Sequence, residues 1–86
     1  MTFQGAVVKE QGVTFGIIIV KSYVLNSDSD KNQMQMFGLR AFGNIPIILM
    51  AQNPSGTPTY YGRKDIVNFL SGILMEQIPW KEYTVN

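Results

Sequence analysis

The stretch from Ile45 to Leu74 constrains the fold more than any other part of the chain. It reads IPIILMAQNPSGTPTYYGRKDIVNFLSGIL and predicts a buried strand, a turn, a second strand and a helix. Its first strand, Ile45 to Gln52, is apolar at nearly every position, as is Ile17 to Val20. A strand with one wet face alternates apolar and polar side chains, so these runs indicate a sheet that is covered on both faces.

The rest of the chain predicts further elements around this stretch. Strands are expected at 5–9, 13–24, 57–61 and 80–85, helices at 28–42 and 64–75, and tight turns at 10–12 and 53–56. Ser27 is a suitable N-cap for the first helix, with Asp30 three residues later, and Gly43 is a suitable stop. Pro58 lacks an N–H group, which places its strand at a sheet edge.

This order of elements predicts a single α+β domain spanning residues 1–86. The order is ββαββα, with a further strand at the end. We expect a two-layer α/β sandwich, in which two helices pack on a mixed sheet of roughly four or five strands. Without the first strand the order is βαββαβ, which favours a ferredoxin-like arrangement.

One third of the chain carries a resemblance to a known fold. Ile45-Pro46 opens a buried strand that is followed by a hairpin and a helix, and this part resembles the last third of a thioredoxin-like domain. The resemblance implies a thioredoxin-like partial arrangement as the alternative fold. It does not imply redox activity, because the chain has no Cys and begins with two strands rather than β-α-β.

The apolar strands leave two ways of covering the sheet. Either one helix lies on each face, or both helices lie on one face and a second copy of the chain covers the other. An 86-residue chain has a thin stability margin, and without Cys or His it cannot gain a disulfide or a thiolate or imidazole metal site. We therefore expect a homodimer.

Composition excludes several classes of function. With seven Lys and Arg against six Asp and Glu, the net charge of +1 does not indicate a nucleic-acid binder. The apolar runs are far shorter than the roughly 20 residues of a membrane span, and the first residues do not form a signal peptide. We expect a cytoplasmic protein without a cofactor, a metal, or a nucleic-acid or membrane partner.

The candidate binding site lies where the strand at 57–61 passes into the second helix. Tyr61 and Gly62 are followed by Arg63 and Lys64, and a helix N-terminus with two cations can hold an anion such as a phosphate. The structural alternative is a plain strand–helix turn with two solvated cations, one of which pairs with Asp65. Met36 and Trp80 are the candidate interface residues, because Met and Trp are enriched at protein interfaces.

Catalytic groups are scarce in this sequence. The Ser residues have no His to activate them, and Asp28 and Asp30 are explained by helix capping. A Lys- or Tyr-based enzyme is left open. We predict a non-catalytic interaction or assembly module that forms homo-oligomers, with a small anionic-ligand or nucleotide-binding domain at Gly62-Arg63-Lys64 as the alternative.

Overall fold

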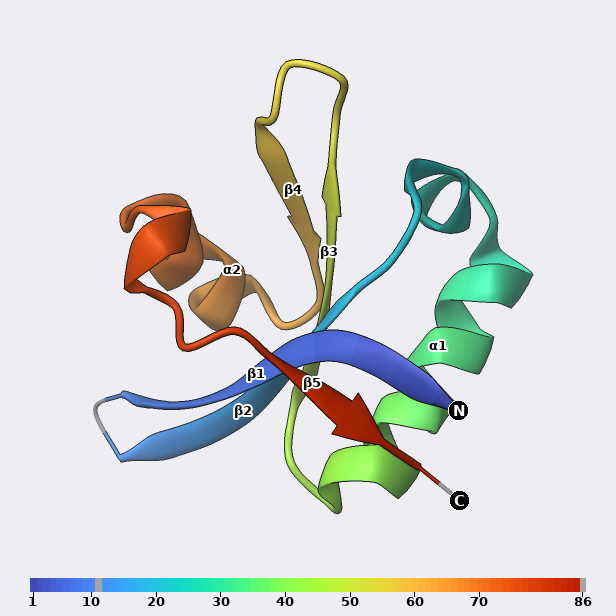
Figure 1. Ribbon diagram of the computed structural model, residues 1–86. Helices are drawn as coiled ribbons and strands as arrows, with labels where there is room; N and C mark the ends of the chain where they lie inside the picture. The colour runs from blue at the N-terminus through green and yellow to red at the C-terminus, as the bar shows by residue number, and fades with distance from the viewer. Residues whose placement is uncertain (11, 86) are drawn as a thin grey trace.

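Five strands and two α-helices form a mixed α+β fold in the computed structural model, which describes residues 1–10 and 12–85 (Figure 1). The strands are β1 (Thr2–Glu10), β2 (Val13–Ile19), β3 (Ile47–Gln52), β4 (Pro58–Tyr61) and β5 (Lys81–Thr84). The helices are α1 (Asp28–Phe42) and α2 (Lys64–Ser71), and the short 3₁₀ segments are η1 (Ser22–Asn26) and η2 (Met75–Gln77). The predicted order of strands and helices is confirmed.

All five strands belong to one sheet in the order β4-β3-β2-β1-β5. β2 and β3 are parallel, whereas the pairs β1–β2, β3–β4 and β1–β5 are antiparallel. Parallel neighbours need a crossover connection, and α1 supplies it between β2 and β3. The strand order differs from the expected ferredoxin-like one, because the two strands joined by α1 are direct neighbours with no strand between them.

The two helices cover opposite faces of the sheet (Figure 1). Successive residues of β3 alternate between two cores: Leu49 packs with Phe37 of α1, and Met50 packs with Leu70 of α2. Leu49 and Met50 are both fully buried. The predicted cover on both faces is therefore confirmed, but the two-layer arrangement is wrong. A sheet that is apolar on both faces needs a layer on each, which gives three layers, α-β-α.

Local signals explain the bounds of α1. Ser27 Oγ accepts a hydrogen bond from the backbone N–H of Asp30 at 3.2 Å, so the predicted N-cap is confirmed. At the other end, Gly43 has φ +91°, and its N–H donates to the carbonyl of Leu39 at 2.9 Å. Because a residue with a side chain adopts this backbone conformation only under strain, glycine ends the helix after Phe42, as predicted.

The α1 side of the sheet is closely packed. A Cβ atom on Gly38 would lie 2.5 Å from Ile47 Cγ2, and one on Gly16 would lie 2.5 Å from the Phe42 ring. These two glycines let the helix and its aromatic side chains approach the strands. Next to them lies an aromatic cluster that consists of Phe3, Phe37, Phe42 and Tyr83, with ring centroids 5.0 to 5.6 Å apart.

The α2 side has a shorter cover than predicted. α2 ends at Ser71 rather than near residue 75, because Gly72 caps it through hydrogen bonds to the carbonyls of Phe69 and Leu70. The chain then turns through η2, and Ile78 and Trp80 extend the cover. The helix that covers this face of the sheet therefore has eight residues, whereas the helix on the other face has fifteen.

Three strands also differ from their predicted bounds by two residues or more. β2 ends at Ile19, since the chain leaves the sheet to bury Val24 of η1 against the α1 side. β1 begins at Thr2 because its first residues pair with β5, a contact between the two ends of the sequence. β3 begins at Ile47, two residues later than expected.

The turn between β3 and β4 forms as predicted. Gly56 has φ +86°, its N–H donates to the carbonyl of Asn53 at 2.9 Å, and Asn53 Oδ1 accepts from the N–H of Thr57 at 2.9 Å. β4 lies at the sheet edge, as Pro58 indicated. In the predicted turn between β1 and β2, Gly12 has a positive φ of +80°, and Gln11 lies outside the described residues.

Candidate functional site

The junction between β4 and α2 is built around Gly62. Its φ is +154°, and a Cβ atom there would lie 2.5 Å from Ile48 Cδ1 and 3.0 Å from the carbonyl oxygen of Ile47. A side chain would collide with β3 and strain the backbone. Glycine is required here by the packing of the turn on the sheet, without any need for a ligand.

Arg63 lies at the N-cap position of α2, and its side chain is held by Asp65 rather than by the helix backbone. Arg63 Nε lies 2.7 Å from Asp65 Oδ1, and Nη2 lies 2.8 Å from Oδ2, so the two side chains form a bidentate ion pair. This hydrogen bonding lowers the pKa of Asp65 to about 2. The carboxylate therefore stays charged at any ordinary pH, and an incoming anion has to compete with it for the guanidinium group.

A second cation reaches this junction from α1. Lys31 Nζ lies 4.4 Å from the centroid of the Tyr61 ring and 3.2 Å from Asp28 Oδ1. The contact with the ring is a cation–π interaction. The sequence carried no signal for it, because thirty residues separate the two side chains and the strand order brings them together.

The four predicted site residues are thus neighbours, but most of their binding capacity is used within the protein. Gly62 is packed on β3, Arg63 is paired with Asp65, and Tyr61 carries Lys31 on its ring. Lys64 is exposed and makes no ion pair among residues 1–10 and 12–85. This geometry matches the plain strand–helix turn more closely than an anion site.

Tyr60 and Tyr61 point to opposite faces of the sheet, as neighbours on a strand do. Tyr61 is 39% exposed, whereas Tyr60 packs against the core on the α2 side. The Tyr60 hydroxyl is buried and has no hydrogen-bond partner in the described part of the chain. Burial also raises the pKa of Tyr60. The alternation along a strand explains why one tyrosine lies inside and the other outside, but it does not show which hydroxyl lacks a partner.

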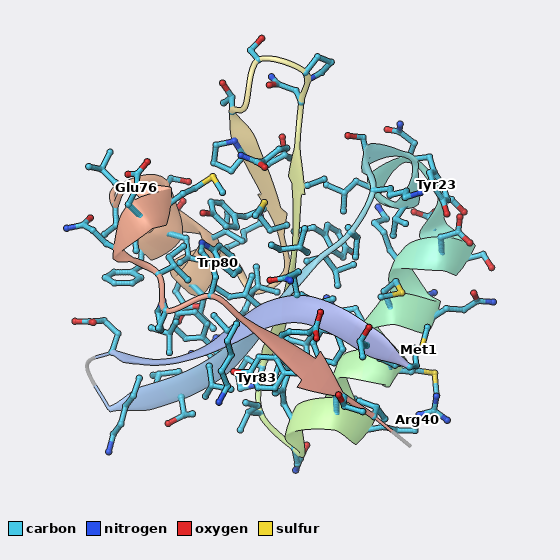
Figure 2. The ribbon with its side chains drawn as sticks, in the orientation of Figure 1. Met1, Tyr23, Arg40, Glu76, Trp80 and Tyr83 are labelled. Carbon is cyan, nitrogen blue, oxygen red and sulfur yellow. The ribbon has the colours of Figure 1, made fainter. Side chains whose placement is uncertain are left out.

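The two predicted interface residues also lie on different sides of the sheet. Figure 2 shows Trp80 on the α2 side and Arg40 on α1. Trp80 is partly buried, and its indole N–H donates to the carbonyl of Met75 at 3.0 Å. Met36 is 67% exposed on α1. These two residues cannot belong to one flat interface.

Met36 has an apolar neighbour that sequence reasoning missed. Leu39, three residues later, is 44% exposed, and the i, i+3 spacing could have identified it. We call the surface around these residues the outer face of α1; it consists of Asn32, Gln33, Met36, Leu39 and Arg40, all of which are exposed.

The described residues contain no group of three or more side chains that could bind a metal ion. None of the helices that these residues form is long and apolar enough to cross a membrane.

Comparison with known proteins gave no relative for this chain. No family model matches the sequence, no curated protein matches it, and no solved structure matches the fold.

Proposed function

We propose that the protein is a non-catalytic assembly module that pairs with a second copy of itself through the outer face of α1. The observation that supports this is the character of that face. A surface helix ordinarily carries charged side chains toward water. Between Lys31 and Arg40, however, α1 has no charged residue, and Met36 and Leu39 are exposed. Protein interfaces are depleted in Lys, Glu and Asp and enriched in Met and Arg.

The charges at the two ends of α1 favour a second copy as the partner. The first turn carries Asp28 and Asp30, and the last turn carries Arg40. In an antiparallel pair related by a twofold axis, each Arg40 lies near the acidic first turn of the other copy. The dipoles of the two helices then also run in opposite directions. Met36 and Leu39 lie between these charged ends and supply the apolar contact.

The size of this face sets the expected affinity. α1 is about 22 Å long at 1.5 Å per residue, and one helical face buries less than the roughly 800 Å² per partner of a standard interface. We therefore expect weak association, which appears at micromolar or higher protein concentration. The sheet itself does not require a second copy of the chain, because each of its faces is covered by a helix.

Sedimentation equilibrium over a wide concentration range tests this proposal. The average mass should rise from 9.7 kDa toward twice that value as concentration increases. Met36→Lys combined with Leu39→Lys should abolish the rise, because it places like charges across the interface. Val7→Lys is the matched control, since Val7 is a 40% exposed apolar residue on β1. A mass of one chain at every concentration would overturn the proposal.

Charge reversal distinguishes the antiparallel pair from other modes of association. Arg40→Asp should weaken the dimer, because it sets two acidic ends against each other. Asp28→Arg added to Arg40→Asp should restore it, since opposite charges then meet again. If the double variant associates as weakly as Arg40→Asp alone, the antiparallel geometry is wrong.

A further inference from the structure

The outer edge of β1 is paired along only part of its length. β5 pairs with residues 2–5 of β1, whereas β1 continues to Glu10. Figure 1 shows β1 and β2 extending past the point where β5 begins. We call residues 6–10 on this side the open edge of β1. Such an edge is a template for another strand, because its backbone N–H and C=O groups are not used within the sheet.

Pro79 ends the pairing of β1 with β5. Continuing the register of this pair by two residues would place Pro79 opposite Val7. Proline has no N–H group that could donate to the Val7 carbonyl. The chain also turns away at this point, where the N–H of Trp80 donates to the carbonyl of Ile78 at 2.8 Å. The protein's own last strand therefore cannot close the open edge of β1.

The backbone groups that point out of this edge belong to Val7 and Lys9. Met1 and Val85 exchange two backbone hydrogen bonds, of 3.1 and 2.8 Å. In an antiparallel pair such positions recur at every second residue, so the odd-numbered residues of β1 direct their N–H and C=O groups away from β2. At Val7 and Lys9 these groups have no hydrogen-bond partner in the described part of the chain. Two donors and two acceptors are thus available to a further strand.

The side chains of the open edge alternate between the two faces of the sheet. Val8 packs against the core on the α2 side, so Glu10 lies on that side as well, and Val7 and Lys9 lie on the other. A hollow of about 210 Å³ borders the edge on the α2 side, and its lining includes Val8, Glu10, Phe69, Ile78 and Pro79. It is smaller than small-molecule pockets, about 300–1,000 Å³, and therefore suits a single apolar side chain.

We propose that the open edge of β1 binds an extended peptide segment of another protein, which adds to the five-stranded sheet as an antiparallel sixth strand. Both neighbours of β1 are antiparallel to it, and antiparallel pairing is slightly the more stable per residue. The backbone groups of Val7 and Lys9 supply affinity, and the alternating side chains supply specificity. This site goes beyond the assembly function proposed above and uses no residue of the outer face of α1.

The side chains of the edge define the sequence of the partner. Read from the N-terminus of the peptide, a cation lies opposite Glu10, an acid opposite Lys9, and two apolar residues opposite Val8 and Val7. The residue opposite Val8 points toward the hollow on the α2 side. Opposite charges directly across two strands stabilise their pairing, whereas like charges destabilise it.

The same side chains disfavour a second copy of the chain at this edge. In antiparallel self-pairing, residues with outward backbone groups face each other. If Val7 meets Lys9 of the other copy, then Glu10 meets Ala6, and each charge faces an apolar side chain. If Lys9 meets Lys9, like charges face each other. If Val7 meets Val7, then Lys9 meets Gly5, whose edge β5 already occupies.

Peptide titrations followed by two-dimensional NMR test the proposal. The probe is the acetylated and amidated tetrapeptide Lys-Glu-Leu-Val, and Glu-Lys-Leu-Val is the matched control with the two charges exchanged. The probe should shift the amide protons of Val7 and Lys9 downfield and leave those of Phe3 and Gly5, which are paired with β5, in place. The control should bind about tenfold more weakly, because two attractive pairs become repulsive.

N-methylated probes test the backbone hydrogen bonds without changing the protein. A methyl group on the nitrogen of the peptide's Glu removes an N–H that donates to the Lys9 carbonyl, so binding should weaken about fivefold or more. A methyl group on the nitrogen of the peptide's Leu is the matched control. That N–H points away from β1, since Leu lies opposite Val8, and the affinity should change little.

A double variant of the protein completes the test. Lys9→Glu combined with Glu10→Lys exchanges two exposed charges, so the protein should fold, and Glu-Lys-Leu-Val should then bind more tightly than Lys-Glu-Leu-Val. The proposal is overturned if neither peptide shifts the signals of Val7 and Lys9, if both N-methylated probes bind equally, or if the charge order has no effect. It is also overturned if these signals shift with protein concentration alone, which would assign the edge to a second copy.

Discussion

The two faces of the sheet are covered by helices of different length, and they are packed differently. On the α1 side, fifteen helical residues and an aromatic cluster cover the strands, and glycines at two contact points remove the space between the layers. On the α2 side, eight helical residues cover the same sheet and leave a groove beside the β3–β4 hairpin.

This difference gives the two sides unequal shares in the stability of the domain. Close packing on the α1 side increases the number of contacts between apolar atoms, and these contacts stabilise a small protein. The α2 side leaves the buried Tyr60 hydroxyl without a hydrogen-bond partner among the described residues, which lowers stability. If this comparison holds, substitutions on the α1 side should be the more damaging to the fold.

The largest expected effect comes from removing an aromatic ring on each side. Phe37→Ala should lower the free energy of unfolding by about 3–5 kcal/mol, because Phe37 is buried and its ring packs 5.1 Å from that of Phe3. Phe69→Ala on α2 should cost about half as much, since Phe69 is only partly buried. Equilibrium urea unfolding measures both. Equal losses would show that the α2 side is packed as closely as the α1 side.

A smaller effect is expected from adding one methyl group on each side. In Gly38→Ala the gain in helix propensity, about 1 kcal/mol, is outweighed by overlap with Ile47 and Ile18. We expect a net loss of about 1–2 kcal/mol, seen as a lower melting temperature. Gly72→Ala is the matched control: φ is −96°, and the nearest atom to the added carbon is 3.5 Å away.

The Gly72 variant should melt within a few degrees of the wild type or slightly above it. A Gly38→Ala protein that is more stable than the wild type would mean that Ile47 and Ile18 yield easily. The close packing on the α1 side would then contribute less to stability than we infer from the difference between the two sides.

The parts of the fold that the sequence predicted are those with local signals. α1 was placed correctly because Ser27 and Gly43 are adjacent to the helix that they end, and the β3–β4 hairpin because Asn53 and Gly56 define their own turn. The end of α2 was missed, since the apolar spacing continues to Leu74 while Gly72 already ends the helix. Apolar periodicity alone therefore does not locate the last turn of a helix.

The non-local features could not be predicted in the same way. The apolar strands indicated cover on both faces, but the sequence left open whether a helix or a second chain supplies it. Strand order depends on contacts between distant segments, such as β1 with β5. At the candidate site, an ion pair between Asp65 and one of the two neighbouring cations was anticipated, and the structure shows that the cation is Arg63. The contact of Lys31 with Tyr61 depends on strand order and could not be anticipated.

The smallest expected effect is the change in stability when the hydroxyl is removed from Tyr60 on one face or from Tyr61 on the other. The pKa of Tyr60 is raised by burial, so the folded state holds its proton more tightly than the unfolded state, where the pKa is about 10. The unfolded state releases that proton first as pH rises, so stability is complete below about pH 10 and falls above it. At neutral pH, Tyr60→Phe should gain about 1 kcal/mol by removing an unpaired buried hydroxyl.

Urea unfolding at neutral and alkaline pH measures both parts of this prediction. The alkaline loss of stability should be smaller in Tyr60→Phe than in the wild type. Tyr61→Phe is the matched control on the α1 side, where the tyrosine is 39% exposed. An identical alkaline loss in the wild type and in Tyr60→Phe would mean that the hydroxyl finds a partner in solution. The α2 side would then be as well satisfied as the α1 side, and the contrast between the two faces would reduce to helix length.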